Sequence, residues 1–464
     1  MLLSTWITLK GSDSMASALG GKTDRKLYIG LLFIIGFSML FPEYIAPLFV
    51  FGLYIYFIIH FKKTGRNAKL GEIGKAFFAY TIYMLISSIW SKSHLSSVLI
   101  SLLWMGCFLA YILVANVVNT KGKLKLAITA MNISTGIIGL IAIVEIISFN
   151  LSKHYGWDFT ISNPLYYNIN DKVFAMLPVE IINKPYSSRA SATFDNPLIL
   201  ATYLVITTPF CAYGSVYFQH SRNRKISRVC LVLALGGLIC TFSRGAYIAV
   251  GLSFLILLIS NKRIFRKLLP FVIVLAIAIP LGITSRYFLS SGDFLASNNN
   301  RLDIWKFSFD MFIHNPVLGL GAGTDNIHTQ LKDFYGLNRS HCHNLALQIL
   351  VEGGVVGAVF VFYIIKNIIK TLKDLYLLKD SRYRPYAIVF ISSIVGFITI
   401  SMFEFTLQSA KEMMIFFIFL GLMEAASRME TDQLQLADDD LITYEEITDE
   451  DYEEKDEKKE KVKA

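Results

Sequence analysis

Long apolar runs recur along most of this chain, and they constrain its fold more than any other feature. The chain has 464 residues, of which 54 % are hydrophobic, and many of the runs approach the roughly 20 residues that a helix needs to cross a bilayer. Inside a bilayer every backbone polar group needs a partner within the protein, so runs of this kind form helices. The sequence therefore predicts an all-α fold, a polytopic transmembrane helical bundle.

About twelve spans are expected. They lie roughly at residues 27–41, 44–61, 76–90, 95–118, 124–149, 197–218, 226–243, 245–260, 268–284, 345–365, 386–403 and 412–427. Residues 27–428 would then form one transmembrane domain, preceded by a short segment at 1–26 and followed by a tail at 429–464. The first residues hold only a brief apolar start before glycine, serine and charged residues, so we expect no cleaved signal peptide.

Basic residues mark every second connection between the expected spans. They are Lys62, Lys63, Arg66, Lys69 and Lys75; Lys121, Lys123 and Lys125; Arg222, Arg224, Lys225 and Arg228; Lys262, Arg263, Arg266 and Lys267; and Lys366, Lys370, Lys373, Lys379, Arg382 and Arg384. Cytoplasmic loops carry such an excess, so these connections and both termini are predicted to be cytoplasmic. The alternate connections then face outward, and two of them are long, at about 150–196 and 285–344.

The charge is unevenly distributed along the chain. Residues 430–464 hold 15 acidic and 5 basic residues, although the whole chain has a net charge of +9. A tail this acidic, with few aromatic residues, is expected to be disordered in the cytoplasm. The basic excess elsewhere suits loops beside an anionic membrane leaflet, so membrane lipids are the expected partners and nucleic acid is not.

The second long outer connection is where we expect the chemistry, because it holds four of the eight histidines: His314, His328, His341 and His343. It begins with an amphipathic helix whose predicted apolar face is formed by Leu302, Trp305, Phe309, Phe312 and Ile313. Asn315-Pro316 ends that helix, because the residue before a proline is pushed out of the helical region. His341-Cys342-His343-Asn344 then leads directly into the tenth span.

Three arginines, Arg189, Arg244 and Arg301, are predicted to lie on the same outer side as these histidines. The planar guanidinium group donates two parallel hydrogen bonds to a phosphate, so this set suits a diphosphate at the depth of a lipid headgroup. Two alternatives stay open. Arg189 and Arg301 are also ordinary residues for a membrane interface, and Arg244 also suits a structural ion pair.

Other charged residues favour a structural interpretation. Glu404, Lys411 and Glu412 lie near an outer end and are expected to pair locally, and Glu145 is expected to be a hydrogen-bonded carboxylate within its span. The five cysteines give no disulfide framework.

A metal site at His341 and His343 is not expected. The two histidines could suggest one, but no carboxylate cluster lies near them in the sequence to complete a coordination shell. The glycines at 319–323 lack the strand and the Lys-Ser/Thr pair of a nucleotide-binding loop, so they indicate a turn.

Several of these residues form a pattern that resembles the O-antigen ligase and polymerase superfamily of polytopic bacterial glycosyltransferases. The pattern consists of Arg301, Trp305, Asn315-Pro316, Gly319, Gly321, His343-Asn344, Leu347, Glu352, Gly353 and Gly357. Two earlier stretches, at 189–197 and 241–245, also look like family motifs. The resemblance covers roughly residues 185–360. Ala192 stands where many members carry glycine, and Leu198 where many carry asparagine.

The resemblance implies an enzyme at the outer face of the cytoplasmic (inner) membrane. Its donor would be a glycan linked to undecaprenyl diphosphate, and its acceptor a glycan or a lipid, with no nucleotide sugar, metal or other cofactor. Arg189, Arg244 and Arg301 would bind the diphosphate. His343 would serve the acceptor, and we expect it to be the general base, because it also precedes a span that holds it still.

The remaining site residues follow from the same resemblance. His341, Asn344 and Glu352 would support His343, and His341 is the competing candidate for the base. A single displacement would invert the anomeric configuration. Two other functions stay open: a transporter such as a flippase of lipid-linked glycans, and a scaffold that uses the acidic tail. A transporter would place ionisable residues and broken helices near the middle of the membrane. The choice between ligase and polymerase also stays open.

Overall fold

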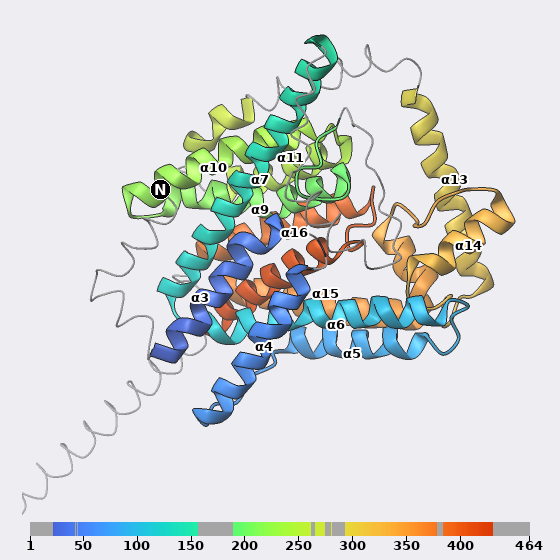
Figure 1. Cartoon of the computed structure of the whole chain (residues 1–464), viewed down its shortest axis with the longest axis horizontal. Helices are drawn as coiled ribbons and strands as arrows, with labels where there is room; N and C mark the ends of the chain where they lie inside the picture. The colour runs from blue at the N-terminus through green and yellow to red at the C-terminus, as the bar shows by residue number, and fades with distance from the viewer. Residues whose placement is uncertain are drawn as a thin grey trace, which may run out of the picture.

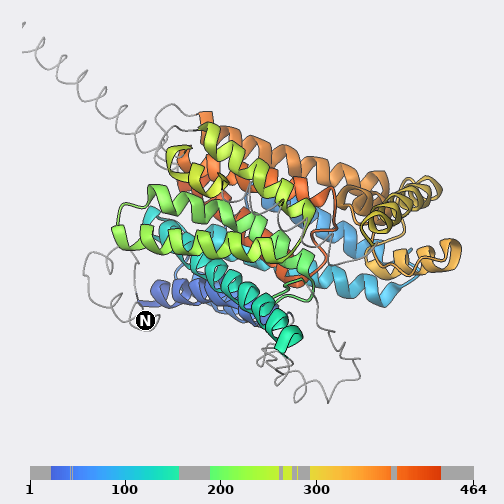
Figure 2. The ribbon, with the colours of Figure 1, turned by 90° about the horizontal axis from the view of Figure 1, so that it is seen from above.

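The computed structural model describes residues 22–41, 43, 45–155, 189–260, 265–273, 280, 293–377 and 384–429. These parts of the chain are mostly helical, and none of them forms a strand, which confirms the predicted all-α class. The helices pack side by side in one bundle. Helices α13 (Asp293–His314) and α14 (Thr324–Tyr335) lie together at one end of it, beyond the long helices (Figure 1, Figure 2).

The other elements follow in chain order. They are α3 (Lys22–Phe37), η1 (Ser38–Leu40), α4 (Ile45–Lys63), α5 (Glu72–Ser87), α6 (His94–Val117), α7 (Lys121–Tyr155), α9 (Pro197–Tyr217), α10 (Ser221–Cys240), α11 (Arg244–Ser260), α15 (Leu345–Leu377) and α16 (Arg384–Ser401). A last helix spans residues 410–429.

Most of the predicted spans coincide with these helices. In the described part of the chain, α4, α6, α7, α9, α15 and α16 are long and apolar enough to cross a membrane, and α11 is apolar but has 17 residues. The ninth predicted span, at 268–284, is helical at 265–273 and otherwise falls largely outside the described residues. The polytopic helical fold is confirmed, while the count of twelve spans stays a prediction.

The centre of the bundle is formed by α9 and by the helix at 410–429, which are buried along almost their whole length. A helix that is apolar on all sides is expected in such a position. Exposed apolar side chains lie on the surrounding helices, among them Leu48, Phe51, Leu95, Leu99, Val359 and Phe362. An apolar outer surface of this extent is typical of contact with lipid.

Helix α15 is interrupted near its start, and the loop after α13 docks on the break. Gly354 has φ 60° and ψ −160°, a backbone conformation that glycine adopts without strain. A Cβ there would lie 2.3 Å from the carbonyl oxygen of Val317. The N–H of Val355 donates to the carbonyl of Pro316 at 2.8 Å. The break therefore fixes α13 and its following loop against the start of α15.

The apolar face predicted for α13 is only partly covered by the rest of the protein. Leu302 is 61 % exposed, Phe309 52 % and Ile313 56 %, and Trp305 and Phe312 are half-buried. The residues that pack inward are Ile304, Ser308 and Met311. Helical spacing reveals an apolar face but not what covers it, and an uncovered apolar face suits the interfacial layer of a membrane.

Candidate active site

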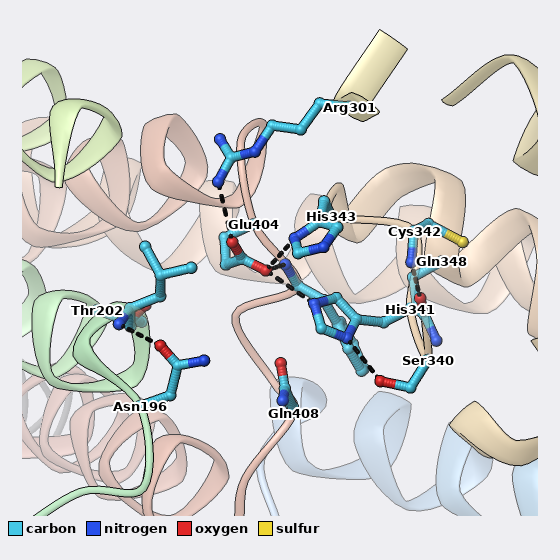
Figure 3. Close-up of polar contacts among 12 residues, drawn as sticks. Asn196, Thr202, Arg301, Ser340, His341, Cys342, His343, Gln348, Glu404 and Gln408 are labelled. Atoms are coloured by element: carbon cyan, nitrogen blue, oxygen red, sulfur yellow. Dashed lines mark hydrogen bonds and ion pairs between the residues drawn. The ribbon is translucent and has the colours of Figure 1, made fainter. Parts of the chain in front are cut away.

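A buried carboxylate, Glu404, connects the residues of the candidate site. It lies in the turn between α16 and the helix at 410–429 and is 4 % exposed. Its Oε1 accepts hydrogen bonds from His341 Nε2 at 3.0 Å and from His343 Nδ1 at 2.8 Å, and its Oε2 meets Arg301 Nη2 at 3.4 Å (Figure 3). The structure thus brings together three of the predicted site residues, from α13 and from the segment before α15.

These partners keep the Glu404 carboxyl ionised. Burial would raise its pKa, but the hydrogen bonds and charges of His341 and His343 lower it to about 2. A buried carboxylate with three donors around it is well compensated. Because Nδ1 of His343 donates to Glu404, its Nε2 carries the lone pair in the neutral ring. That nitrogen is the one that can accept a proton.

The backbone holds His343 in an uncommon conformation. Its φ is 48°, a left-handed value that a non-glycine residue adopts only when its surroundings impose it. Asn344 supplies much of that support, because its Oδ1 caps α15 through the N–H of Leu347 at 3.1 Å. Its Nδ2 donates to the carbonyl of Met402 at 3.1 Å. Asn344 therefore ties the histidine segment to the turn that carries Glu404.

Glu352 supports the same segment from inside α15. It is buried and accepts a hydrogen bond from Gln348 Nε2 at 2.6 Å. Gln348 in turn accepts from the backbone N–H of Cys342, between the two histidines, at 3.0 Å. Glu352 thus supports the histidine segment indirectly, through Gln348, which the sequence did not single out.

The other two predicted arginines meet at a neighbouring turn. Arg189 Nε donates to the carbonyl of Thr241 at 2.9 Å, and Arg244 begins α11 just after that turn. A Cβ on Gly245 would lie 3.2 Å from Cβ of Phe403, so the start of α11 packs against the residue before Glu404. The segment that carries Arg244 therefore borders the Glu404 turn, and Arg189 lies beside the residues that precede that segment.

The segment around Arg189 is held by Glu145 of α7. The carboxylate accepts from the backbone N–H of Ser191 at 3.0 Å and of Ala192 at 2.7 Å, as expected for a hydrogen-bonded structural carboxylate. Ala192 has φ 48°. That value explains why a glycine is suited to this position, since glycine reaches positive φ at little energetic cost.

The expected local pairing of Glu404, Lys411 and Glu412 is wrong in its partners. Glu404 binds the histidines and Arg301, as described above. Lys411 is buried, donates to the carbonyl of Thr193 and lies over the ring of Phe194 at 4.9 Å. Glu412 accepts from the backbone N–H groups of Gln408 and Ser409. The intervening turn separates the side chains that the sequence places close together.

A metal site was not expected because the sequence places no carboxylate near the two histidines, and that premise is wrong. A carboxylate does lie beside the two histidines, because the fold brings Glu404 to them from about 60 positions along the chain, and the ligand atoms of the three residues lie within 4.8 Å of one another. From the sequence, Glu404 was assigned a structural role and Gln348 was not singled out, although both belong to the candidate site. The available signal in the sequence was an acidic residue in the short break between two apolar runs.

Comparison with known proteins supports one of the sequence expectations directly. Residues 229–362 match the family model described as O-Antigen ligase. The matched segment contains Arg244, Arg301, His341 and His343, whereas Glu404 lies beyond it. No curated protein matches the sequence. Over these residues the chain is similar to the O-antigen ligase family, which supports its relation to the O-antigen ligase and polymerase superfamily.

Proposed function

We propose that this protein transfers a glycan from undecaprenyl diphosphate to an acceptor hydroxyl, at the outer face of the cytoplasmic membrane. One observation carries the proposal: His343, in the segment that matches the family, is held by a buried carboxylate that also meets Arg301. This arrangement places a proton acceptor beside a side chain suited to phosphate.

His343 is the general base in this proposal. Its Nε2 accepts the proton of the acceptor hydroxyl as the hydroxyl oxygen forms a bond to the anomeric carbon of the donor. The bond from that carbon to the diphosphate oxygen breaks in the same step, so the configuration inverts. Glu404, at 2.8 Å from Nδ1, stabilises the imidazolium that forms and holds the ring in the required tautomer. Such a base typically contributes ~10²–10⁴-fold in rate.

The arginines serve the leaving group. The diphosphate gains negative charge as the anomeric bond breaks, and fixed guanidinium groups stabilise that charge without reorganisation. Arg301 is held by Glu404 at 3.4 Å and Arg189 by the carbonyl of Thr241 at 2.9 Å. Arg244 starts the helix beside them. The chemistry needs no metal and no nucleotide sugar.

A transporter fits these observations less well. Alternating access calls for broken helices and ionisable groups at the middle of the membrane. Here His343 and Glu404 lie in turns and Arg301 lies within α13, with α13 and α14 together at one end of the bundle (Figure 2, Figure 3). The placement favours an enzyme with its site at one membrane face.

The test is transfer from a purified lipid-linked glycan by the full-length protein in lipid nanodiscs. His343→Ala is expected to lose ~10²–10⁴-fold in transfer rate and to retain donor binding, whereas Arg301→Lys is expected to weaken donor binding, because lysine lacks the bidentate fork. His341→Ala should be milder than His343→Ala. His314→Ala is the matched control, since that side chain is 71 % exposed.

Transfer by His343→Ala at the wild-type rate would remove the general base from the mechanism. Wild-type transfer in the presence of a chelator is the expected result for metal-independent chemistry. The products separate the two family activities: one glycan on a new acceptor indicates a ligase, and longer chains on the carrier indicate a polymerase.

We propose that both termini are cytoplasmic. Every second connection is basic, and basic connections face the cytoplasm. Single cysteines placed in intact cells test this orientation. A membrane-impermeant maleimide is expected to label positions in the 285–344 connection and to spare positions at 62–75. Labelling at 62–75 would reverse the orientation and move the site to the other face.

A further inference from the structure

The two histidines and Glu404 also form a set of metal-ligand atoms. His341 Nε2 and His343 Nδ1 lie 3.0 and 2.8 Å from the same oxygen, Glu404 Oε1, and the three ligand atoms fall within 4.8 Å of one another. The imidazole rings are 4.1 Å apart at their centroids. Hydrogen bonds explain the present contacts, and the same three atoms lie close enough together to share one ion.

We propose that His341, His343 and Glu404 bind a first-row transition-metal ion such as Zn²⁺, and that the bound ion switches off His343 as a base. The second half of this proposal rests on the proposed function, and the first half does not. Two imidazoles and one carboxylate favour Zn²⁺, Co²⁺ or Ni²⁺ over Mg²⁺ and Ca²⁺, which prefer oxygen ligands only.

The geometry is close to what an ion requires. Zinc binds imidazole nitrogen and carboxylate oxygen at ~2.0–2.2 Å, so ligand atoms around a tetrahedral ion lie roughly 3.3 Å apart. The pairs at 2.8 and 3.0 Å therefore open by a few tenths of an ångström, and the two histidine nitrogens, which lie within 4.8 Å of each other, move together to reach the same spacing. Three protein ligands leave at least one position for water or substrate.

The surroundings also suit an ion that enters from solution. The side chains of His341 and His343 are 12 % and 16 % exposed, so the site is shielded but reachable. Arg301 contacts the other carboxylate oxygen at 3.4 Å. An outer partner of this kind orients a ligating carboxylate, although its positive charge weakens the attraction for a dication.

The effect on catalysis follows from which nitrogen the ion occupies. In the hydrogen-bonded state Nδ1 of His343 carries the proton and Nε2 is free to accept another. An ion on Nδ1 displaces that proton, so the neutral ring now carries its proton on Nε2. The same nitrogen then cannot accept the proton of the acceptor hydroxyl. A metal at this site is thus an inhibitor.

Cobalt binding tests the site without any need for activity. The full-length protein, purified in nanodiscs and stripped of metal, is titrated with Co²⁺ while the visible d–d absorption is recorded. We expect one saturable ion per chain, displaced by Zn²⁺ and not by Mg²⁺ or Ca²⁺. His341→Ala should weaken binding at least ~10-fold, the loss that even an outer-shell partner typically causes, and the exposed His314→Ala should bind as wild type. Absent binding, or binding unchanged in His341→Ala, overturns the site.

Transfer assays then test the switch. Zn²⁺ should suppress transfer by the wild-type protein, a chelator should restore it, and His314→Ala should be inhibited like wild type. In His341→Ala the inhibitory concentration should rise by the same factor as the binding constant. Transfer that persists at saturating Zn²⁺, or that requires Zn²⁺, overturns the switch. Cobalt binding through His341 in a protein that transfers no glycan would instead leave the metal site standing and remove the proposed function.

Discussion

Two buried ionic clusters lie on one short stretch of chain and differ in what surrounds them. Glu404 is surrounded by ionisable side chains, and Arg301, His341 and His343 keep 28 %, 12 % and 16 % of their surface exposed. Lys411 is 2 % exposed, donates to the carbonyl of Thr193 and lies over Phe194.

The second cluster includes Glu43, which accepts from the backbone N–H of Ala410 at 2.6 Å. Burial, and then the neighbouring carboxyl of Asp195, raise the pKa of Glu43 to about 8, while the charge of Lys411 opposes the rise. Such a carboxyl is largely neutral near pH 7. The buried Lys411 therefore lies beside a half-buried acid, Glu43, and an exposed one, Asp195, whereas Glu404 contacts bases that reach the surface.

The difference separates a structural charge from a functional one. A charge whose partners are backbone and buried groups has nothing left to offer a ligand, so it serves to join segments. When the partners of a carboxylate are partly exposed bases, those bases can still contact a substrate or an ion. The two clusters should accordingly respond to substitution in different measurements.

The largest effect is expected at Lys411. Lys411→Met keeps the apolar stem but leaves the Glu43–Asp195 pair and the carbonyl of Thr193 without their cation. Leaving the buried carbonyl of Thr193 without its donor typically costs about 1–3 kcal/mol. Thermal unfolding in detergent should show a clearly lower midpoint, while the protein that remains folded transfers glycan near the wild-type rate. A normal midpoint with lost transfer would place Lys411 in the active site instead.

Glu404→Gln should show the opposite pattern. The amide keeps the size of the carboxyl but loses the charge that stabilises the His343 imidazolium, so the tautomer is no longer enforced. The transfer rate should fall toward the lower end of the ~10²–10⁴-fold that a general base contributes. The unfolding midpoint should move less than in Lys411→Met. If Glu404→Gln unfolds as readily as Lys411→Met and transfers normally, the contrast between the clusters fails.

The smallest effect is expected at Ala192, three positions after Arg189. Ala192→Gly relieves a left-handed backbone that costs a non-glycine residue ~1–2 kcal/mol, although the added freedom of the unfolded chain offsets part of that gain. The unfolding midpoint should rise slightly. Ala190→Gly is the matched control, because Ala190 is buried and not among the residues with positive φ. It should lower the midpoint, and a drop in both variants would argue against strain at Ala192.

The sequence predicted the helices well, because an apolar run is a local pattern that can be recognised without knowing the fold. Its predictions for the site were partial. Arg301, His341 and His343 were expected at one face and do meet. The two histidines precede α15, whose start the apolar pattern marks, whereas Arg301 lies within α13. The sequence marked the apolar face of α13 but not what covers it, because an apolar stripe packs equally well against protein or lipid.

Glu404 escaped prediction for a different reason. Its partners lie about 60 and 100 positions away in the chain, and its sequence neighbours Lys411 and Glu412 suggested nearer ones. The pairing of charged side chains depends on their distance in space. The turn after Glu404 changes the direction of the chain, so Lys411 and Glu412 point elsewhere.

The sequence by itself determined that this chain forms apolar helices, where most of them lie, and which polar residues fall between them. Backbone hydrogen bonding in an apolar environment leaves no other choice. The tertiary structure alone decided that Glu404 joins both histidines to Arg301, that Lys411 serves the interior, and that His343 and Ala192 adopt positive φ. Those properties come from contacts between segments distant in the chain, which no local pattern encodes.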